Sequence, residues 1–136
     1  MISDCILIDT ETTGIVDPVA IEIAWMRLES ASELRVLDGF HQYYNPGKPI
    51  SFGAMATHHI TNEDVENCLP ISEFKFPVGV DYIIGHNVDF DWNVLGKPDV
   101  KRICTLALAR KAWPNADSHT QSALMYMLYG AAAKHA

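Results

Sequence analysis

Hydrophobic residues occur along the chain both in short continuous runs and at wider spacing, which predicts a mixture of strands and helices. The apolar run at residues 5–9 ends in a polar residue and predicts a buried central strand that delivers Asp9 at its carboxyl end. Residues 20–28 and 34–44 are rich in β-branched and aromatic side chains and predict two more strands, joined by a hairpin turn at 29–33.

The second half of the chain predicts strands and helices in alternation. The expected elements are strands at 81–85 and 101–104 and helices at 89–95, 105–113 and 118–130. Ser118 should begin the last helix and Gly130 should end it, while Thr61 with the acids after it predicts an additional helix start. Three strands followed by this alternation favour an α/β fold, with a central sheet of mixed direction flanked by helices.

Composition fits a compact folded domain. The chain has 136 residues, of which 49% are hydrophobic and 20% charged, enough for one domain with a real core. The three cysteines are far apart and indicate reduced thiols. No signal peptide pattern and no membrane-spanning apolar run are visible, so we expect a soluble, cytoplasmic protein without membrane contact. The net charge of -7 argues against a broad basic surface that coats nucleic acid.

Asp9 and Glu11 are the first candidates for chemistry. They lie two positions apart on a predicted strand, so their carboxylates should point to the same side. Two carboxylates held close repel each other, and a hard divalent cation between them relieves the repulsion. The small residues that follow, Thr12, Thr13 and Gly14, would let a nucleotide approach the backbone. The alternative is a solvated strand end, which is the common meaning of an isolated Asp-x-Glu.

A second polar group follows the strand predicted at 81–85. Asp91 would project from the first turn of the next helix, near the positive end of its dipole. Asp89 is another candidate metal ligand, and the alternative for Asp89 and Asn87 is that they cap the helix. His86 is either part of the site or a buried histidine whose nitrogens are satisfied within the protein.

Together these two groups resemble the first two motifs of the DEDD 3′→5′ exonuclease superfamily, and especially its bacterial exonuclease X group. The motifs read Asp-Thr-Glu-Thr-Thr-Gly after an apolar strand and Gly-His-Asn-x-x-Phe-Asp further on, with supporting stretches at 48–61 and 102–114. The resemblance covers nearly the whole chain in the family's order. It implies a ribonuclease H-like fold, two Mg²⁺ or Mn²⁺ ions, and hydrolysis of phosphodiester bonds from a 3′ end.

The same resemblance implies roles for four residues. Asp9, Glu11 and Asp91 would be the first three of the superfamily's four metal-binding acids, and Asp9 would bridge both ions. His135 is either the general base, or a neighbour of it, or a terminal residue without a role. The family's third motif, a histidine with an aspartate five positions later, is incomplete at 136 residues. We therefore expect a single exonuclease domain, residues 1–136, that binds metals poorly and cleaves slowly or not at all.

Other residues are candidates for substrate contact. They are Thr10, Thr12, Thr13, Met55, His58 and Phe90. The threonines would contact the sugar of the terminal nucleotide through their backbone, and the other three would stack against the last bases, since stacking tolerates any sequence. Core packing is the alternative for Met55 and Phe90. Glu22 lies on a strand of apolar neighbours and is expected to be structural, or to support the metal ligands without binding the ion itself.

The resemblance thus implies a 3′→5′ exodeoxyribonuclease that trims single-stranded DNA ends in repair or proofreading, with a polymerase as a candidate partner. One alternative is an RNA-trimming exoribonuclease of the same superfamily, because the contact that would sense a 2′-hydroxyl is not visible. The other alternative is a catalytically inactive module that binds a strand end, which the missing fourth acid supports.

Overall fold

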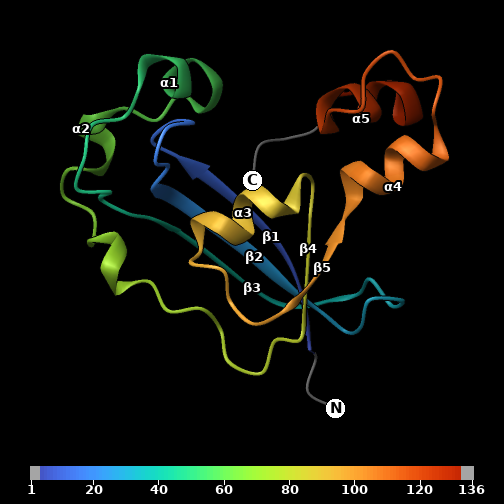
Figure 1. Ribbon diagram of the computed structural model, residues 1–136, viewed down its shortest axis with the longest axis horizontal. Coiled ribbons are helices and arrows are strands. Elements are labelled where there is room, and N and C mark those ends of the chain that lie inside the picture. Colours follow the sequence, from blue (N-terminus) through green and yellow to red (C-terminus); the bar gives the residue numbers. More distant parts are fainter. Residues whose placement is uncertain (1–3, 133–136) are drawn as a thin grey trace.

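A five-stranded mixed sheet forms the centre of the computed structural model, which describes residues 4–132 (Figure 1). The strands are β1 (Cys5–Thr12), β2 (Ala20–Leu28), β3 (Val36–Tyr43), β4 (Tyr82–Gly85) and β5 (Lys101–Cys104), in the order β3-β2-β1-β4-β5. β1 is central: it pairs antiparallel with β2 and parallel with β4. The predicted sheet of mixed direction is therefore confirmed.

Among residues 4–132, five helices and one 3-10 turn flank the sheet. They are α1 (Phe52–His58), α2 (Asn62–Val65), η1 (Ile71–Glu73), α3 (Val88–Val94), α4 (Thr105–Ala112) and α5 (Gln121–Tyr129). In Figure 1, α1 and α2 lie near the carboxyl end of β1, while α4 and α5 stand apart from them on the far side of α3. Within residues 4–132, no helix is both long enough and apolar enough to cross a membrane.

The two faces of β1 bury different sets of residues. Ile6 and Ile8 belong to the core that includes Val88 of α3. Cys5 and Leu7, which alternate with them, pack in a separate cluster on the other face. The same alternation carries Asp9 and Glu11 onto that second face, beyond its apolar part.

Two helix starts differ from the predictions. No helix was expected at α1, although Ser51 caps it by accepting a hydrogen bond from the Ala54 backbone N–H at 3.1 Å. The last helix begins after Thr120 rather than at Ser118, because the Thr120 hydroxyl accepts the bond from the Ala123 N–H at 3.2 Å. The helix start at Thr61 is confirmed and has a reciprocal capping box with Asp64.

Candidate active site

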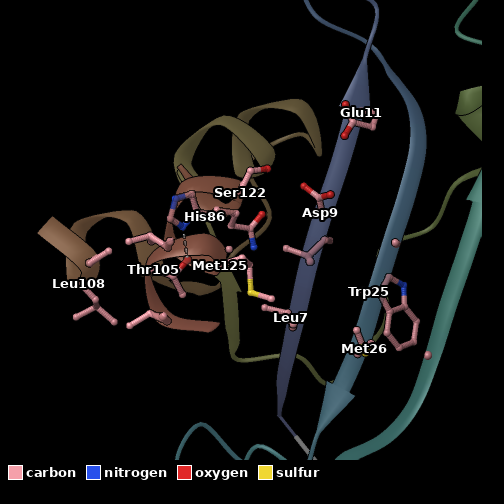
Figure 2. A pocket seen from close by; sticks show the side chains of 18 of the residues that line it. Leu7, Asp9, Glu11, Trp25, Met26, His86, Thr105, Leu108, Ser122 and Met125 are labelled. Carbon is pink, nitrogen blue, oxygen red and sulfur yellow. Dashed lines mark hydrogen bonds between the residues drawn. The ribbon is translucent and has the colours of Figure 1, made fainter. Parts of the chain in front are cut away.

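Two carboxylates leave β1 on the same side. Asp9 is exposed and Glu11 is half-buried, and Figure 2 shows both side chains on one side of the strand, with Asp9 directed into the cavity beside it. On the neighbouring strand β2, Ala24 lies opposite Asp9 and Glu22 lies opposite Glu11. The small Ala24 side chain leaves room in front of Asp9, so this carboxylate can meet a ligand.

Asp91 reaches β1 from the first turn of α3. Its side chain is 4% exposed, and its Oδ1 accepts hydrogen bonds from the Thr10 backbone N–H at 3.0 Å and the Thr10 hydroxyl at 2.6 Å. The pairing of β1 with β4 ends at Leu7 and Ile84, so beyond this point β1 has no strand partner on that side. Asp91 supplies the missing acceptor there, since a buried backbone N–H must be satisfied.

The ionisation of Asp91 reflects its position. Burial raises the pKa of the Asp91 carboxyl from 3.8 to about 6; the bond from the Thr10 hydroxyl opposes this rise in pKa, and the negative charge of Asp9 adds to it. Asp9 is therefore close enough to Asp91 to influence its charge. A buried acid with a raised pKa beside a second acid is typical of a functional site.

The chemistry of these donors fits a hard divalent cation. Mg²⁺ and Mn²⁺ prefer carboxylate oxygen, and Mg²⁺ is commonly held by one or two carboxylates while water and substrate phosphate supply the rest. Asp9 and Glu11 meet that requirement for one ion. In the part of the chain from 4 to 132, no group of three or more His, Cys, Asp or Glu side chains could hold a metal ion. The three-acid, two-ion arrangement with Asp91 therefore stays a prediction.

The acid pair opens onto a cavity of about 1230 Å³ between the sheet and the α4–α5 pair (Figure 2). Its walls are largely apolar and include Leu7, Met26, Leu108, Trp113, Met125 and Leu128. Asp9, Glu11 and His86 provide polar groups. A large cavity with apolar walls and a few converging polar groups is the usual form of a ligand site.

His86 ties three elements together at the edge of this cavity. The Thr105 hydroxyl lies 2.9 Å from Nδ1, and Nε2 donates to the His119 carbonyl at 2.7 Å. Because a carbonyl oxygen only accepts, Nε2 carries the proton and Nδ1 accepts from Thr105 when the ring is neutral. Both ring nitrogens of His86 are thus satisfied within the protein, as one of its two alternatives has it, but the ring is half-buried and also lines the cavity. Its bonds fix the start of α4 and the loop before α5, and so one wall of the cavity.

Asn87 and Asp89 do not act as the sequence predicts. Asn87 occupies the N-cap position of α3, but its backbone is left-handed, with φ 64°, and its side chain makes no capping bond. Asparagine tolerates this conformation better than most residues, which accounts for its presence there. Asp89 is paired with Arg102, with 2.8 Å between Oδ1 and Nη1. Two residues apart on a helix, Asp89 and Asp91 point to different sides, so Asp89 does not join the acid pair.

The three threonines predicted to contact substrate have bonds within the protein, and all three are buried. Thr10 donates to Asp91, the Thr12 hydroxyl donates to the Gly14 carbonyl at 3.0 Å, and the Thr13 hydroxyl accepts from the Val19 N–H at 3.1 Å. These side chains therefore shape the end of β1 and the loop after it. Contact between their backbone and a nucleotide stays a prediction.

The residues predicted to stack on bases are also engaged. His58 is buried: its Nε2 donates to the Thr12 carbonyl and its Nδ1 accepts from the Ile60 N–H, both at 3.0 Å. Met55 packs against a buried core cluster, in line with its alternative role in packing. Phe90 is half-buried. Base contact by His58 and Phe90 stays a prediction, and His135 lies outside the described residues.

The pairing of Glu22 with His41 near the site was not predicted from the sequence. Glu22 is only 4% exposed, and its Oε2 lies 2.5 Å from Nε2 of His41 on β3. Glu22 was expected to be structural or to support the metal ligands, but His41 was not singled out. The period of two along β2 and β3 was the available signal, because it places both side chains on the face of the sheet that carries Asp9 and Glu11.

The sequence matches an exonuclease family profile and parts of two kinds of DNA-processing protein. A family profile described as exonuclease matches residues 6–135. Exodeoxyribonuclease 10 of Escherichia coli K12 is 34% identical over 110 residues, which are 79% of this chain and 48% of that protein. A PolC-type DNA polymerase III of Listeria welshimeri is 29% identical over 131 residues, 85% of this chain but 9% of that protein. The chain thus spans about half the length of the matched exodeoxyribonuclease and a small part of the polymerase.

Solved structures show the same fold. Exonuclease X in complex with 5′ overhanging duplex DNA has a TM-score of 0.76 and 30% identity, covering 90% of this chain and 72% of that one. A structure of exonuclease I has a TM-score of 0.72 and 19% identity, covering 94% of this chain and 36% of that one, which is a likeness of fold alone. The expected ribonuclease H-like fold is confirmed.

Proposed function

The chain belongs to the exonuclease family, and from that premise we propose that it is a metal-dependent 3′→5′ exodeoxyribonuclease that prefers single-stranded DNA. The acid pair Asp9 and Glu11, on one side of β1 at the edge of a large cavity, is the observation that carries this proposal. Two similarities support DNA as substrate. One relative is named an exodeoxyribonuclease, and a similar structure was solved with duplex DNA.

Some residues of the site would bind metal ions, and others would hold the site in shape. Asp9 and Glu11 would hold an Mg²⁺ or Mn²⁺ ion, and Asp91 is the candidate for a second ion. Ions bound there would neutralise negative charge on the scissile phosphate, which is the largest electrostatic need of the reaction. Thr10 fixes Asp91 in place through its two hydrogen bonds. His86 holds the α4–α5 wall, so the cavity can shield the reacting groups from bulk water.

A second candidate function is a module that binds a strand end without cleaving it. It is favoured by the lack, within residues 4–132, of any three-ligand group able to hold a metal ion. The similarity to part of a DNA polymerase III supports a polymerase as partner in either case. That partner and a cytoplasmic location stay predictions.

The test is a cleavage assay on 5′-labelled single-stranded DNA with Mg²⁺ or Mn²⁺, using the full-length protein. We expect a ladder of shortened products, no ladder with Asp9→Ala, and a normal ladder with Asp99→Ala, an exposed aspartate in the turn before β5. Melting temperatures should stay close to wild type in both variants. A parallel RNA oligonucleotide of the same sequence separates the two substrates.

Each outcome decides between the candidates. A ladder that persists in Asp9→Ala would refute the proposed nuclease site. DNA binding without any ladder would favour the non-cleaving module. Faster shortening of the RNA would replace the DNA assignment with an exoribonuclease.

A further inference from the structure

A third carboxylate, that of Glu22, lies on the same face of the sheet as Asp9 and Glu11. Glu22 is the direct cross-strand partner of Glu11 in the β1–β2 ladder. Directly opposite residues of an antiparallel pair share a face and have Cβ atoms about 4.5–5.5 Å apart. The two glutamates differ in freedom, because Glu22 is buried whereas Glu11 is half-buried.

Two side chains from β3 hold Glu22 in place. Nε2 of His41 lies 2.5 Å from Glu22 Oε2, a short hydrogen bond in which the ring nitrogen donates to the carboxylate. Burial raises the pKa of the Tyr43 hydroxyl, and the negative charge of Glu22 and a hydrogen bond to it raise that pKa further. Tyr43 stands directly opposite Glu22 in the β2–β3 ladder. Glu22 is therefore a negative charge in a fixed position.

A fixed charge opposite Glu11 has two effects. Like charges directly opposite each other on neighbouring strands repel, so the Glu11 carboxylate is favoured in rotamers that turn away from β2. The same charge adds to the negative potential around Asp9 and Glu11, which attracts a divalent cation. Both effects depend on the charge of Glu22 and not only on its volume.

We propose that Glu22, held by His41 and Tyr43, is a positioning residue that directs the Glu11 carboxylate and strengthens divalent-cation binding at the Asp9–Glu11 pair. This role rests on the proposed function, because it requires a cation at that pair. Glu22 itself would not touch the ion. A merely structural glutamate would support the sheet and leave cation affinity unchanged.

The expected effect can be estimated from the charge. A negative charge roughly 5–8 Å from a divalent ion, in an aqueous dielectric with about 10 mM salt to screen it, changes ion affinity about three- to tenfold. Glu22→Gln removes the charge but keeps an oxygen that can still accept from His41. Glu22→Asp keeps the charge and shortens the side chain by one methylene. Glu33→Gln is the matched control, since it makes the same change of net charge in the exposed β2–β3 hairpin.

The experiment is a titration of the full-length protein with Mn²⁺, followed by electron paramagnetic resonance of the free ion, with Asp9→Ala to define binding at the acid pair. We expect Asp9-dependent binding in wild type, about three- to tenfold weaker binding in Glu22→Gln, and affinities near wild type in Glu22→Asp and Glu33→Gln. Thermal denaturation in EDTA should show Glu22→Gln folded.

The outcomes separate this inference from the proposed function. Unchanged Mn²⁺ affinity in a folded Glu22→Gln overturns the positioning role and leaves the acid pair intact. Equal loss in Glu22→Gln and Glu22→Asp also overturns it, because shape and not charge would then matter. If Glu22→Gln does not fold, Glu22→Asp decides, and a loss of about threefold or more in that variant counts against the inference. If wild type shows no binding that depends on Asp9, the metal site and the positioning role fail together.

Discussion

Replacing Asp91 by asparagine tests whether this carboxylate is buried at a cost to stability. The substitution Asp91→Asn would keep the shape of the side chain and an oxygen that can accept both bonds from Thr10. What it removes is the negative charge. Because burial disfavours that charge, we expect Asp91→Asn to stabilise the metal-free protein at neutral pH.

The size of the gain follows from the ionisation of Asp91. Its pKa rises from 3.8 to about 6 on folding, and each whole pKa step is worth about 1.4 kcal/mol, which gives about 3 kcal/mol. Below about pH 3.8 the carboxyl is protonated in both the folded and the unfolded protein, and the penalty is absent. As the pH rises toward about 6, the unfolded chain loses its proton first, so folding becomes less favourable. Above about pH 6 the full penalty is present.

The assay is thermal denaturation in EDTA between pH 4 and pH 8, with wild type, Asp91→Asn and Asp89→Asn. The advantage of Asp91→Asn over wild type should grow with pH and level off above about pH 6, at about 3 kcal/mol or roughly 10 °C in melting temperature. Asp89→Asn is the matched control, because Asp89 is exposed on the same helix. It should show only a small loss, within about 1 kcal/mol, from its surface pair with Arg102.

A difference between Asp91→Asn and wild type that stays constant from pH 4 to pH 8 would refute this reasoning. It would mean that Asp91 titrates as it does in the unfolded chain, and that its burial carries no electrostatic penalty. A pH-dependent loss of stability would refute it as well, since the hydrogen bonds from Thr10 would then outweigh the burial.

Two other variants test the geometry around the cavity. His86→Phe keeps a ring but loses the bonds to Thr105 and the His119 carbonyl, so we expect urea denaturation to show a loss of about 1–3 kcal/mol in unfolding free energy. Amide exchange relative to wild type should speed up more in α5 than in β1. Unchanged exchange in α5 would contradict the role of these bonds. Gly85→Ala would place a Cβ 3.1 Å from Val88 Cγ2 and 3.2 Å from the Ile8 carbonyl oxygen, so we expect a loss of about 1–3 kcal/mol. Adding Val88→Ala should relieve only the contact with Val88 Cγ2, because the Ile8 oxygen and Val88 Cβ, the latter at 3.3 Å, remain. Full additivity of the two changes in unfolding free energy would show that the side chains do not interact.

The sequence was most informative where local pattern determines structure. The apolar run of β1 and the two-residue spacing of Asp9 and Glu11 were enough to place both carboxylates on one face, because strand alternation leaves no other choice. The Thr61 capping box was predictable for the same reason, since all its contacts are within four residues. Family resemblance added the ribonuclease H-like fold, which local pattern could not choose among mixed α/β folds.

Contacts between distant segments could not be predicted in this way. Thr10 and Asp91 are 81 positions apart, and their bond depends on where β4 ends beside β1. The pairing of Glu22 with His41 needs the register of β2 against β3, which a sequence pattern does not fix. Asn87 shows the opposite error, because a residue typical of side-chain capping is used here for its tolerance of a left-handed backbone.

The clustered acids of this site lower the stability of the fold but favour the binding of a cation. Thr10 bonds stabilise the buried Asp91 and His41 stabilises the buried Glu22, yet the charge of Asp9 still raises the pKa of Asp91. Concentrated negative charge destabilises the folded state, whereas the same concentration is what attracts a divalent cation. A cation bound by the folded protein alone would therefore offset the repulsion and stabilise the fold by mass action. Cation binding and folding are therefore thermodynamically linked through the same carboxylates.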